Sequence, residues 1–391
     1  MTTGFFHYAD LTWPEIAALP RYTPLVIPLG DGYPLDKLSE ALGSPSSAGM
    51  LPPIPYGWEG SGLRVADHLL ETMITNLLDS LRDDGFTQVY ALTPPGVAIG
   101  LGVARIALPR KPAQTGSSAS TPSALPSDAE HDKVIIIPIG HTEQHGYHLP
   151  MSTDTLIIDA IAQGVIQIAP DRTFALPVMP YGVSTHRSSF AGTLNAGGRA
   201  FEDFWVGVMD ILIERRFDRM YLLSGHGGNC SFLVNAVKYA GERHRRAFCA
   251  TAWLYLSSPD GVAALQKHRH SAIGGMGHAG ELETSLILHL RPDLVHMERV
   301  VDETDFVATP SYYMDWVEGG ALVANPPWDD DTKTGAYGAG SLATAEHGEI
   351  WLKAAIAEKA THVDEIHEQQ SRREARRKGG FGLWANDRFE S

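Results

Sequence analysis

Short apolar runs alternate with longer segments of helical periodicity along most of the chain. The runs that predict strands buried on both faces are residues 24–30, 87–95, 134–139, 174–182, 218–223 and 248–256. Apolar residues at helical spacing predict helices at residues 11–20, 63–81, 154–168, 199–216, 232–245 and 283–289. Strands that alternate with helices in this way indicate an α/β fold with a mostly parallel sheet.

One segment interrupts the alternation. Residues 111–132 are rich in Ser, Ala, Pro and Thr and show no periodicity. This composition predicts a flexible linker or a long surface loop. We therefore expect an N-terminal region, residues 1–110, and a second region, residues 133–391, on either side of it.

The two regions share short sequences in the same order. LPPIPYG at 51–57 matches LPVMPYG at 176–182 at five of seven positions, and PLVIPLG at 24–30 resembles VIIIPIG at 134–140. We interpret the first region as a smaller α/β region that is a degenerate partial copy of the second. Chance similarity of strand and turn sequences is the alternative. The copy lacks the polar residues that follow the later strands, so we expect it to bind no metal and to serve packing, assembly or pocket shaping.

Composition narrows the classes of function. The chain has 391 residues and a net charge of −15, which argues against binding to nucleic acid or to an anionic membrane surface. Its two cysteines, Cys230 and Cys249, form no disulfide framework and fit a reducing cytosol. No signal peptide and no run of 18 apolar residues is present. We therefore expect a cytoplasmic protein without a transmembrane helix.

Polar residues are concentrated directly after the apolar run at 134–139. The residues concerned are His141, Glu143, His145, His148 and Asp154. Charged groups near a core are costly unless they are paired, and a divalent metal is a suitable partner for imidazole and carboxylate groups. In an extended segment Glu143 and His145 point to the same side. A polar loop with scattered histidines is the alternative, and Asp154 is alternatively a simple helix N-cap.

Two later motifs add candidate ligands. His226 lies in SGHGGN, directly after a predicted strand, where ligands bind in parallel α/β sheets. HAGELETS carries His278, Glu281 and Glu283, and one of the two glutamates is expected to serve only the helix N-terminus. A phosphate-binding loop at SGHGGN is disfavoured, because the GxGxxG spacing and the P-loop lysine are absent. Two metals that share Asp154 would leave His278 for proton transfer.

Together these motifs resemble the creatininase (creatinine amidohydrolase) family. The matching segments, in the family's order, are GHTEQHGYHLPMSTDT, PYGVSTH, SGHGGN, HAGELETSLILHLRPDLV and SLATAEHGE, within about residues 133–360. The resemblance implies a three-layer α/β/α sandwich, a site for two divalent metal ions (zinc, manganese or iron) and a homo-oligomer, a hexamer. Family members mostly hydrolyse C–N bonds of cyclic amides or formamides, whereas some relatives cleave peptides or open carbocyclic ketones.

The resemblance also assigns residues to roles. Glu143, Asp154 and His226 would hold one metal, and His145, Asp154 and an acidic residue would hold the other. In creatininase that acidic residue follows the GH motif by two positions, but Gly228 stands there in this chain, so we assign the role to Glu283. Three residues are expected to line the substrate pocket, namely Ser184, His186 and His148.

These observations predict an enzyme that acts on a small molecule. A metal-bridging hydroxide would attack the carbonyl of a small cyclic amide or a related C–N bond, and His278 would be the catalytic residue that transfers a proton. Three alternatives remain open. They are a hydrolase that opens a carbocyclic ketone of the inosose type by C–C cleavage, a peptidase acting on a carrier peptide, and a non-catalytic metal-binding scaffold.

Overall fold

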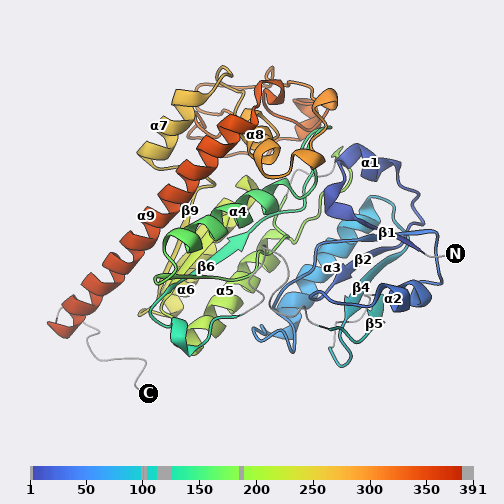
Figure 1. Ribbon diagram of the computed structural model, residues 1–391. Helices are drawn as coiled ribbons and strands as arrows, with labels where there is room; N and C mark the ends of the chain where they lie inside the picture. Colours follow the sequence, from blue (N-terminus) through green and yellow to red (C-terminus); the bar gives the residue numbers. More distant parts are fainter. Residues whose placement is uncertain (1–2, 98–99, 101–103, 112–124, 185–188, 381–391) are drawn as a thin grey trace.

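The chain folds around two parallel sheets that lie side by side (Figure 1). The computed structural model describes residues 3–97, 100, 104–111, 125–184 and 189–380. The sheet of the second region has the order β7-β6-β8-β9. Its strands are β6 (Val134–Ile139), β7 (Thr173–Ala175), β8 (Arg219–Ser224) and β9 (Phe248–Ala252).

Helices cover both faces of this second sheet. Helices α4 (Thr153–Ile168) and α9 (Ala345–Lys378) pack on one face, and α5 (Gly198–Glu214) and α6 (Gly227–Arg243) pack on the other. Helices α7 (Pro259–His268) and α8 (Glu281–Leu290) pack against α9 instead. Alternate residues of β6 enter different cores, because successive side chains of a strand point to opposite faces. Ile135 and Ile137 pack in the core that contains Phe201 of α5, whereas Ile136 packs in the core that contains Ile161 of α4. The predicted α/β fold with a parallel sheet between helical layers is confirmed.

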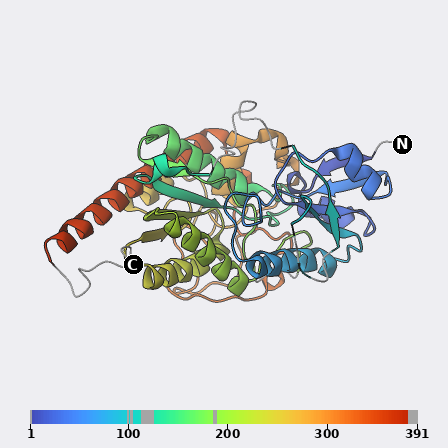
Figure 2. The same ribbon diagram turned by 90° about the horizontal axis from the view of Figure 1, so that it is seen from below.

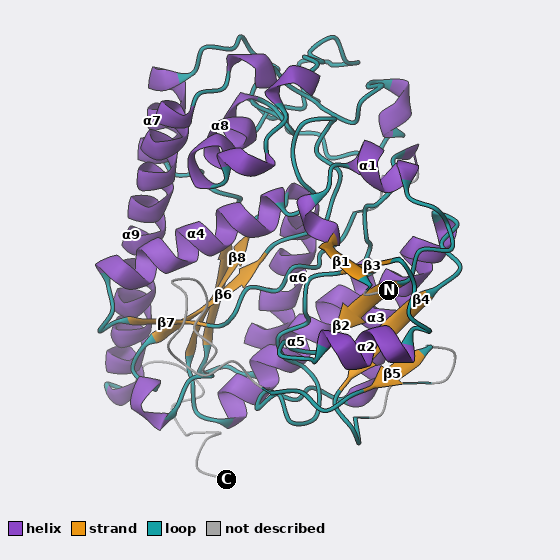
Figure 3. Cartoon of the chain, turned by 45° about the vertical axis from the view of Figure 1, so that its right-hand side comes forward, coloured by secondary structure: helices purple, strands orange, loops and turns teal. Residues whose placement is uncertain are grey.

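The helix α9 is the longest element among the described residues. It runs along α4, α7 and α8 and extends beyond them at its C-terminal end (Figures 1 and 3). Its sequence does not predict a core helix, since the buried stripe that includes Trp351, Ala355 and Val363 is narrow and the rest is mostly polar or charged. No helix in the described part of the chain is both long enough and apolar enough to cross a membrane.

The first region contributes a five-stranded parallel sheet with the order β1-β3-β2-β4-β5. Its elements are β1 (Gly4–His7), α1 (Trp13–Ala18), β2 (Leu25–Pro28), α2 (Leu35–Ala41), β3 (Ser47–Met50), α3 (Asp67–Asp83), β4 (Val89–Thr93) and β5 (Arg105–Ala107). Helix α3 packs against α5 (Figure 2). One continuous core contains Met73 and Leu77 of α3 together with Phe204 and Trp205 of α5.

The two sheets pair residues in the same register. Leu25 of β2 lies opposite Val89 and Gly49, just as Ile135 of β6 lies opposite Met220 and Phe174. The helices that precede β4 and β8 have the same length, 17 residues. This register supports our interpretation of the first region as a partial copy. The duplication and the domain boundaries at 110 and 133 remain predictions.

The guanidinium group of Arg110 lies at the carboxyl edge of the first sheet. The corresponding edge of the second sheet carries the polar residues that follow Gly140. The Arg110 side chain stacks on Trp58, with its Cζ atom 4.8 Å from the ring centroid. Its Nη1 atom donates to the carbonyl oxygen of Asp31 at 3.2 Å. Gly30 accommodates the group, because a Cβ atom there would lie 2.4 Å from Nη1. Arg110 therefore places a positive charge at this edge of the first sheet.

We expect the substitution Arg110→Ala to weaken folding without changing the metal content. Loss of the stacked, largely buried guanidinium should lower the free energy of unfolding by about 1–2 kcal/mol. Urea denaturation and metal analysis of the same samples measure both quantities, and Lys111→Ala, at the exposed neighbouring residue, is the matched control. An altered metal content in Arg110→Ala would contradict a purely structural role.

The N-terminal segment also supports the loop that precedes α4. The amide nitrogens of Met151 and Ser152 donate to the carbonyl oxygens of Leu11 and Ala9, both at 2.9 Å. The hydroxyl of Tyr8 donates to Gly192 O at 3.0 Å. Backbone donors that lie just before Asp154 are thus satisfied by residues about 140 positions earlier.

Several predicted elements differ in extent from the structure. The helix expected at 63–81 begins at Asp67, and the strand expected at 248–256 ends at Ala252. The strand expected at 174–182 is regular only over β7 and then continues as an extended segment with one bridge, between Ile139 and Met179. Pro177 and Pro180 explain the early end, because proline has no N–H for a ladder. The helix expected at 232–245 begins at Gly227 instead, so the glycines of SGHGGN form its first turn.

Part of the predicted linker 111–132 lies outside the described residues, namely 112–124. In the described part of the linker, two carbonyl oxygens accept hydrogen bonds from the second region. Arg215 donates to Pro126 O, and Arg219 Nη1 donates to Asp132 O at 2.8 Å. The flexibility of the linker remains a prediction.

Candidate metal centre

Five polar side chains from separate parts of the second region converge at the carboxyl edge of its sheet. Glu143 and His145 come from the loop after β6, Asp154 from the first turn of α4, His226 from the end of β8, and Glu283 from the first turn of α8. None of the five is more than 5% exposed. In a parallel sheet all carboxyl ends lie at one edge, which brings together residues about 140 positions apart in the chain.

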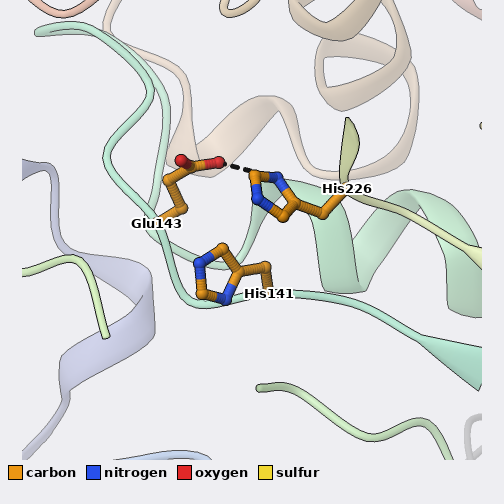
Figure 4. Close-up of side chains that lie close together, drawn as sticks. All are labelled: His141, Glu143 and His226. Carbon is orange, nitrogen blue, oxygen red and sulfur yellow. Dashed lines mark ion pairs between the residues drawn. The ribbon is translucent and has the colours of Figure 1, made fainter. Parts of the chain in front are cut away.

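His226 directs a nitrogen lone pair at two carboxylates. Its Nε2 atom lies 3.0 Å from the carbonyl oxygen of Val183. Because a carbonyl only accepts, Nε2 carries a proton, and in the neutral ring that a metal requires Nδ1 carries the lone pair. Nδ1 lies 2.9 Å from Glu143 Oε2 and 3.2 Å from Asp154 Oδ2 (Figure 4 shows the contact with Glu143).

His145 repeats this arrangement on the other side of Asp154. Its Nδ1–H donates to the carbonyl oxygen of Glu143 at 3.0 Å. Its Nε2 atom therefore carries the lone pair, 3.1 Å from Asp154 Oδ1 and 3.7 Å from Glu283 Oε2. The two histidines thus approach the two oxygens of one carboxylate, and Asp154 belongs to both groups.

With neutral rings these contacts bring acceptor atoms together, so without a metal each ring needs an additional proton, which a divalent cation can replace. Asp154 Oδ2 and His145 Nε2 are buried and make no hydrogen bond among the described residues. Burial lowers the pKa of His145 but Asp154 raises it, and the balance is a pKa of about 9. Burial raises the pKa of Glu283 to about 7, against the opposing effect of His145. Imidazole nitrogens with carboxylate oxygens are ligands that Zn²⁺, Mn²⁺ and Fe²⁺ accept, so the residues fit two divalent ions.

Two glycines of SGHGGN allow the close approach of these elements. A Cβ atom at Gly225 would lie 2.3 Å from the carbonyl oxygen of Asp154, so only glycine lets β8 end against α4. A Cβ atom at Gly228 would lie 2.4 Å from Val183 O. An acidic side chain therefore does not fit at position 228, which agrees with the assignment of that role to Glu283.

His278 lies beside the five convergent residues. Its Nε2–H donates to the carbonyl oxygen of Gln144 at 2.7 Å, so the lone pair is on Nδ1, 3.9 Å from Glu143 Oε2. The ring packs against His145 and Trp328, at centroid distances of 4.1 and 4.8 Å. Burial, followed by the effect of His145, lowers the pKa of His278 to about 3. The group is thus a neutral imidazole whose lone pair is on Nδ1.

The residues predicted to contact substrate have different surroundings. The Ser184 hydroxyl donates to Glu143 Oε1 at 3.2 Å and so orients this carboxylate. His148 Nε2 contacts the hydroxyl of Thr284 at 2.9 Å, on the side of α8. His186 lies outside the described residues. Substrate contact by Ser184, His148 and His186 remains a prediction.

His141 also lies at this centre, and it has no predicted role. The amide of Gly182 donates to its Nδ1 at 2.9 Å, so the proton is on Nε2. This Nε2–H is buried and has no acceptor among the described residues. The ring lies 4.4 Å from that of His226 (Figure 4). Its sequence signal is its position directly after Gly140, at the end of the strand.

Comparison with known proteins adds independent information. The family model described as "Creatininase: Creatinine amidohydrolase" matches residues 119–363. The "Mycofactocin precursor peptide peptidase" of Mycobacterium ulcerans is 34% identical over 198 residues, covering 48% of this chain and 67% of the relative. The "3-dehydro-scyllo-inosose hydrolase" of Thermotoga maritima is 30% identical over 199 residues, covering 49% and 61% of the two chains.

A solved structure is similar over 61% of the chain. A mutant creatininase described as "Zn-Zn type" aligns with a TM-score of 0.50 and 25% identity, covering 61% of this chain and 92% of that one. The matched part of this chain spans about two thirds of the mycobacterial relative and less of the Thermotoga relative.

Proposed function

This chain belongs to the creatininase (creatinine amidohydrolase) family, and from that membership we propose that it is a hydrolase that uses two divalent metal ions to cleave the C–N bond of a small cyclic amide. The observation that carries the proposal is Asp154, whose two oxygens face the lone pairs of His145 and His226 at 3.1 and 3.2 Å. A carboxylate in this position is suited to bridge two ions. The solved "Zn-Zn type" creatininase supports a centre of two metals.

The roles of the residues follow from their proton positions. Glu143, Asp154 and His226 hold one ion, and His145, Asp154 and Glu283 hold the other. When bound, the two ions polarise a substrate carbonyl and acidify a water molecule. His278 accepts a proton at Nδ1 and returns it to the leaving nitrogen. The Nε2–H of His141 offers a hydrogen bond to a substrate oxygen, and this contact would satisfy a donor that is costly to leave unpaired.

Burial of the centre favours a small substrate. No ligand residue is more than 5% exposed, whereas an extended peptide needs an open groove along the reacting bond. Assembly into a homo-oligomer is part of the same proposal.

Two other functions remain as candidates, each favoured by one relative. Identity of 34% to a peptidase favours cleavage of a peptide. Identity of 30% to an inosose hydrolase favours C–C cleavage of a cyclic ketone. In both cases the same residues would act on a different carbonyl.

A substrate panel tests the proposal. Protein loaded separately with Zn²⁺, Mn²⁺ or Fe²⁺ is incubated with creatinine, lactams, formamides, a peptide and an inosose-type diketone. We expect a cyclic amide to gain one water, detected by mass spectrometry, with turnover lost on chelation and restored by metal. Turnover of the peptide or the diketone alone would replace the proposal by the corresponding candidate, and no turnover in any metal form would overturn it.

A further inference from the structure

A second cluster of metal-binding side chains lies on the opposite side of α8 from Glu283. It consists of His270, which follows α7, Glu281, the first residue of α8, and His347 in the first turn of α9. Side chains two positions apart on a helix point about 200° apart. Glu281 and Glu283 therefore face different surroundings, and only Glu283 lies near His145.

Glu281 is a fully buried carboxylate with two backbone donors. Its Oε1 accepts from His270 N at 2.8 Å, and its Oε2 accepts from Ser271 N at 2.7 Å. These bonds fix the carboxylate and leave each oxygen a further lone pair. Within the part of the chain that the structure describes, no lysine or arginine forms an ion pair with Glu281. A buried carboxylate without a cation is costly.

His347 directs an unsatisfied nitrogen at this carboxylate. Its Nδ1 is buried, has no hydrogen-bond partner among the described residues, and lies 3.8 Å from Glu281 Oε1. That distance is too long for a hydrogen bond. It is close to the separation of about 3.3 Å between two ligands of one tetrahedral zinc ion with bonds of about 2.0 Å. The Thr344 hydroxyl accepts from His347 N at 3.1 Å and so fixes this turn.

The third ligand comes from the surface. The His270 ring lies 4.4 Å from that of His347, and a ligand atom of each of the three residues lies within 4.8 Å of the others. The His268 ring lies 6.0 Å from His347. One carboxylate and two imidazoles, with a further imidazole or water for the fourth position, form a donor set typical of zinc.

We propose that His270, Glu281 and His347 form an additional cation site, suited to Zn²⁺, that joins the end of α7 to the first turns of α8 and α9. The ion would neutralise Glu281 and satisfy His347 Nδ1. Since α8 also presents Glu283, the site would stabilise the helix that supplies one side of the candidate metal centre. The proposal does not depend on the reaction that the protein catalyses.

Zinc counting separates this site from the centre at Asp154. The protein is saturated with Zn²⁺, freed of unbound metal and analysed for zinc per chain, together with the variants His347→Ala, His270→Ala and His367→Ala. His270 is exposed, so its substitution does not disturb the core. His367 is a partly buried histidine farther along α9, in contact with Arg172 O at 3.1 Å, and is the matched control.

We expect His347→Ala and His270→Ala each to bind one zinc ion fewer than the unsubstituted protein, and His367→Ala to bind the same number. The difference does not depend on how many ions the Asp154 centre holds. Equal zinc counts in all four proteins would overturn the proposal, as would an equal loss in His367→Ala.

Discussion

Replacement of Asp154 by alanine is expected to release both metal ions of the candidate centre and to reduce turnover to that of the chelated protein. Its Oδ1 lies 3.1 Å from His145 Nε2 and its Oδ2 lies 3.2 Å from His226 Nδ1. Loss of a shared ligand lowers the affinity for both ions at once. The loss should exceed the factor of about 10–100 in affinity that changes in outer-shell partners cause. Metal analysis of the purified protein measures the result.

The experiment is best made in the His347→Ala background, so that an ion bound by His270, Glu281 and His347 is not counted. Asp159→Asn is the matched control, because Asp159 lies on the same helix and contacts Gln163 rather than the centre. This control should keep its metals. Two ions retained in the Asp154→Ala protein would refute the bridge, and one ion retained would show that the two groups are independent.

The second large effect is expected for His278→Ala, with turnover lowered and metals kept. The Nδ1 lone pair of His278 faces the centre from 3.9 Å, and its Nε2–H is anchored on Gln144 O at 2.7 Å. Removal of a group that transfers a proton costs about 10²–10⁴ in kcat. We therefore expect kcat to fall within that range while the metal content stays unchanged.

His362→Ala controls for the loss of a histidine elsewhere in the same region. His362 contacts the hydroxyl of Tyr221 at 2.6 Å and lies on α9. Its substitution should leave kcat unaltered. Unchanged turnover in His278→Ala would remove the proton-transfer role, and a fall in bound metal would make His278 a ligand instead.

Much of the fold is predictable because the central strands β2 and β6 are apolar at every position. The apolar run at 134–139 predicts a strand, and β6 covers the same residues, since both of its faces enter cores. The helix α9 is not predictable in the same way. Its buried positions recur every three or four residues, but Glu358, Lys359 and Gln370 are among them, so the apolar stripe is interrupted.

The candidate site is predictable in composition but not in detail. Sequence reasoning brings Glu143, His145, Asp154 and His226 to one sheet edge, because each follows a strand. The choice of Glu283 over Glu281 rests on the resemblance and not on spacing, since it depends on how α8 docks. The proton position of His141 is also out of reach, because the amide of Gly182, 41 residues later, determines it.

The hydrogen bonds from Met151 and Ser152 to Leu11 and Ala9 limit how the chain can be dissected. A fragment that keeps only residues 119–363, which the family model matches, would lack the carbonyl oxygens of Leu11 and Ala9. The amides of Met151 and Ser152, just before Asp154, would then lose their acceptors. It would also expose the face of α5 that α3 covers, including Phe204. We therefore expect that a fragment with an intact centre must begin near the N-terminus, well before the first motif that resembles the family.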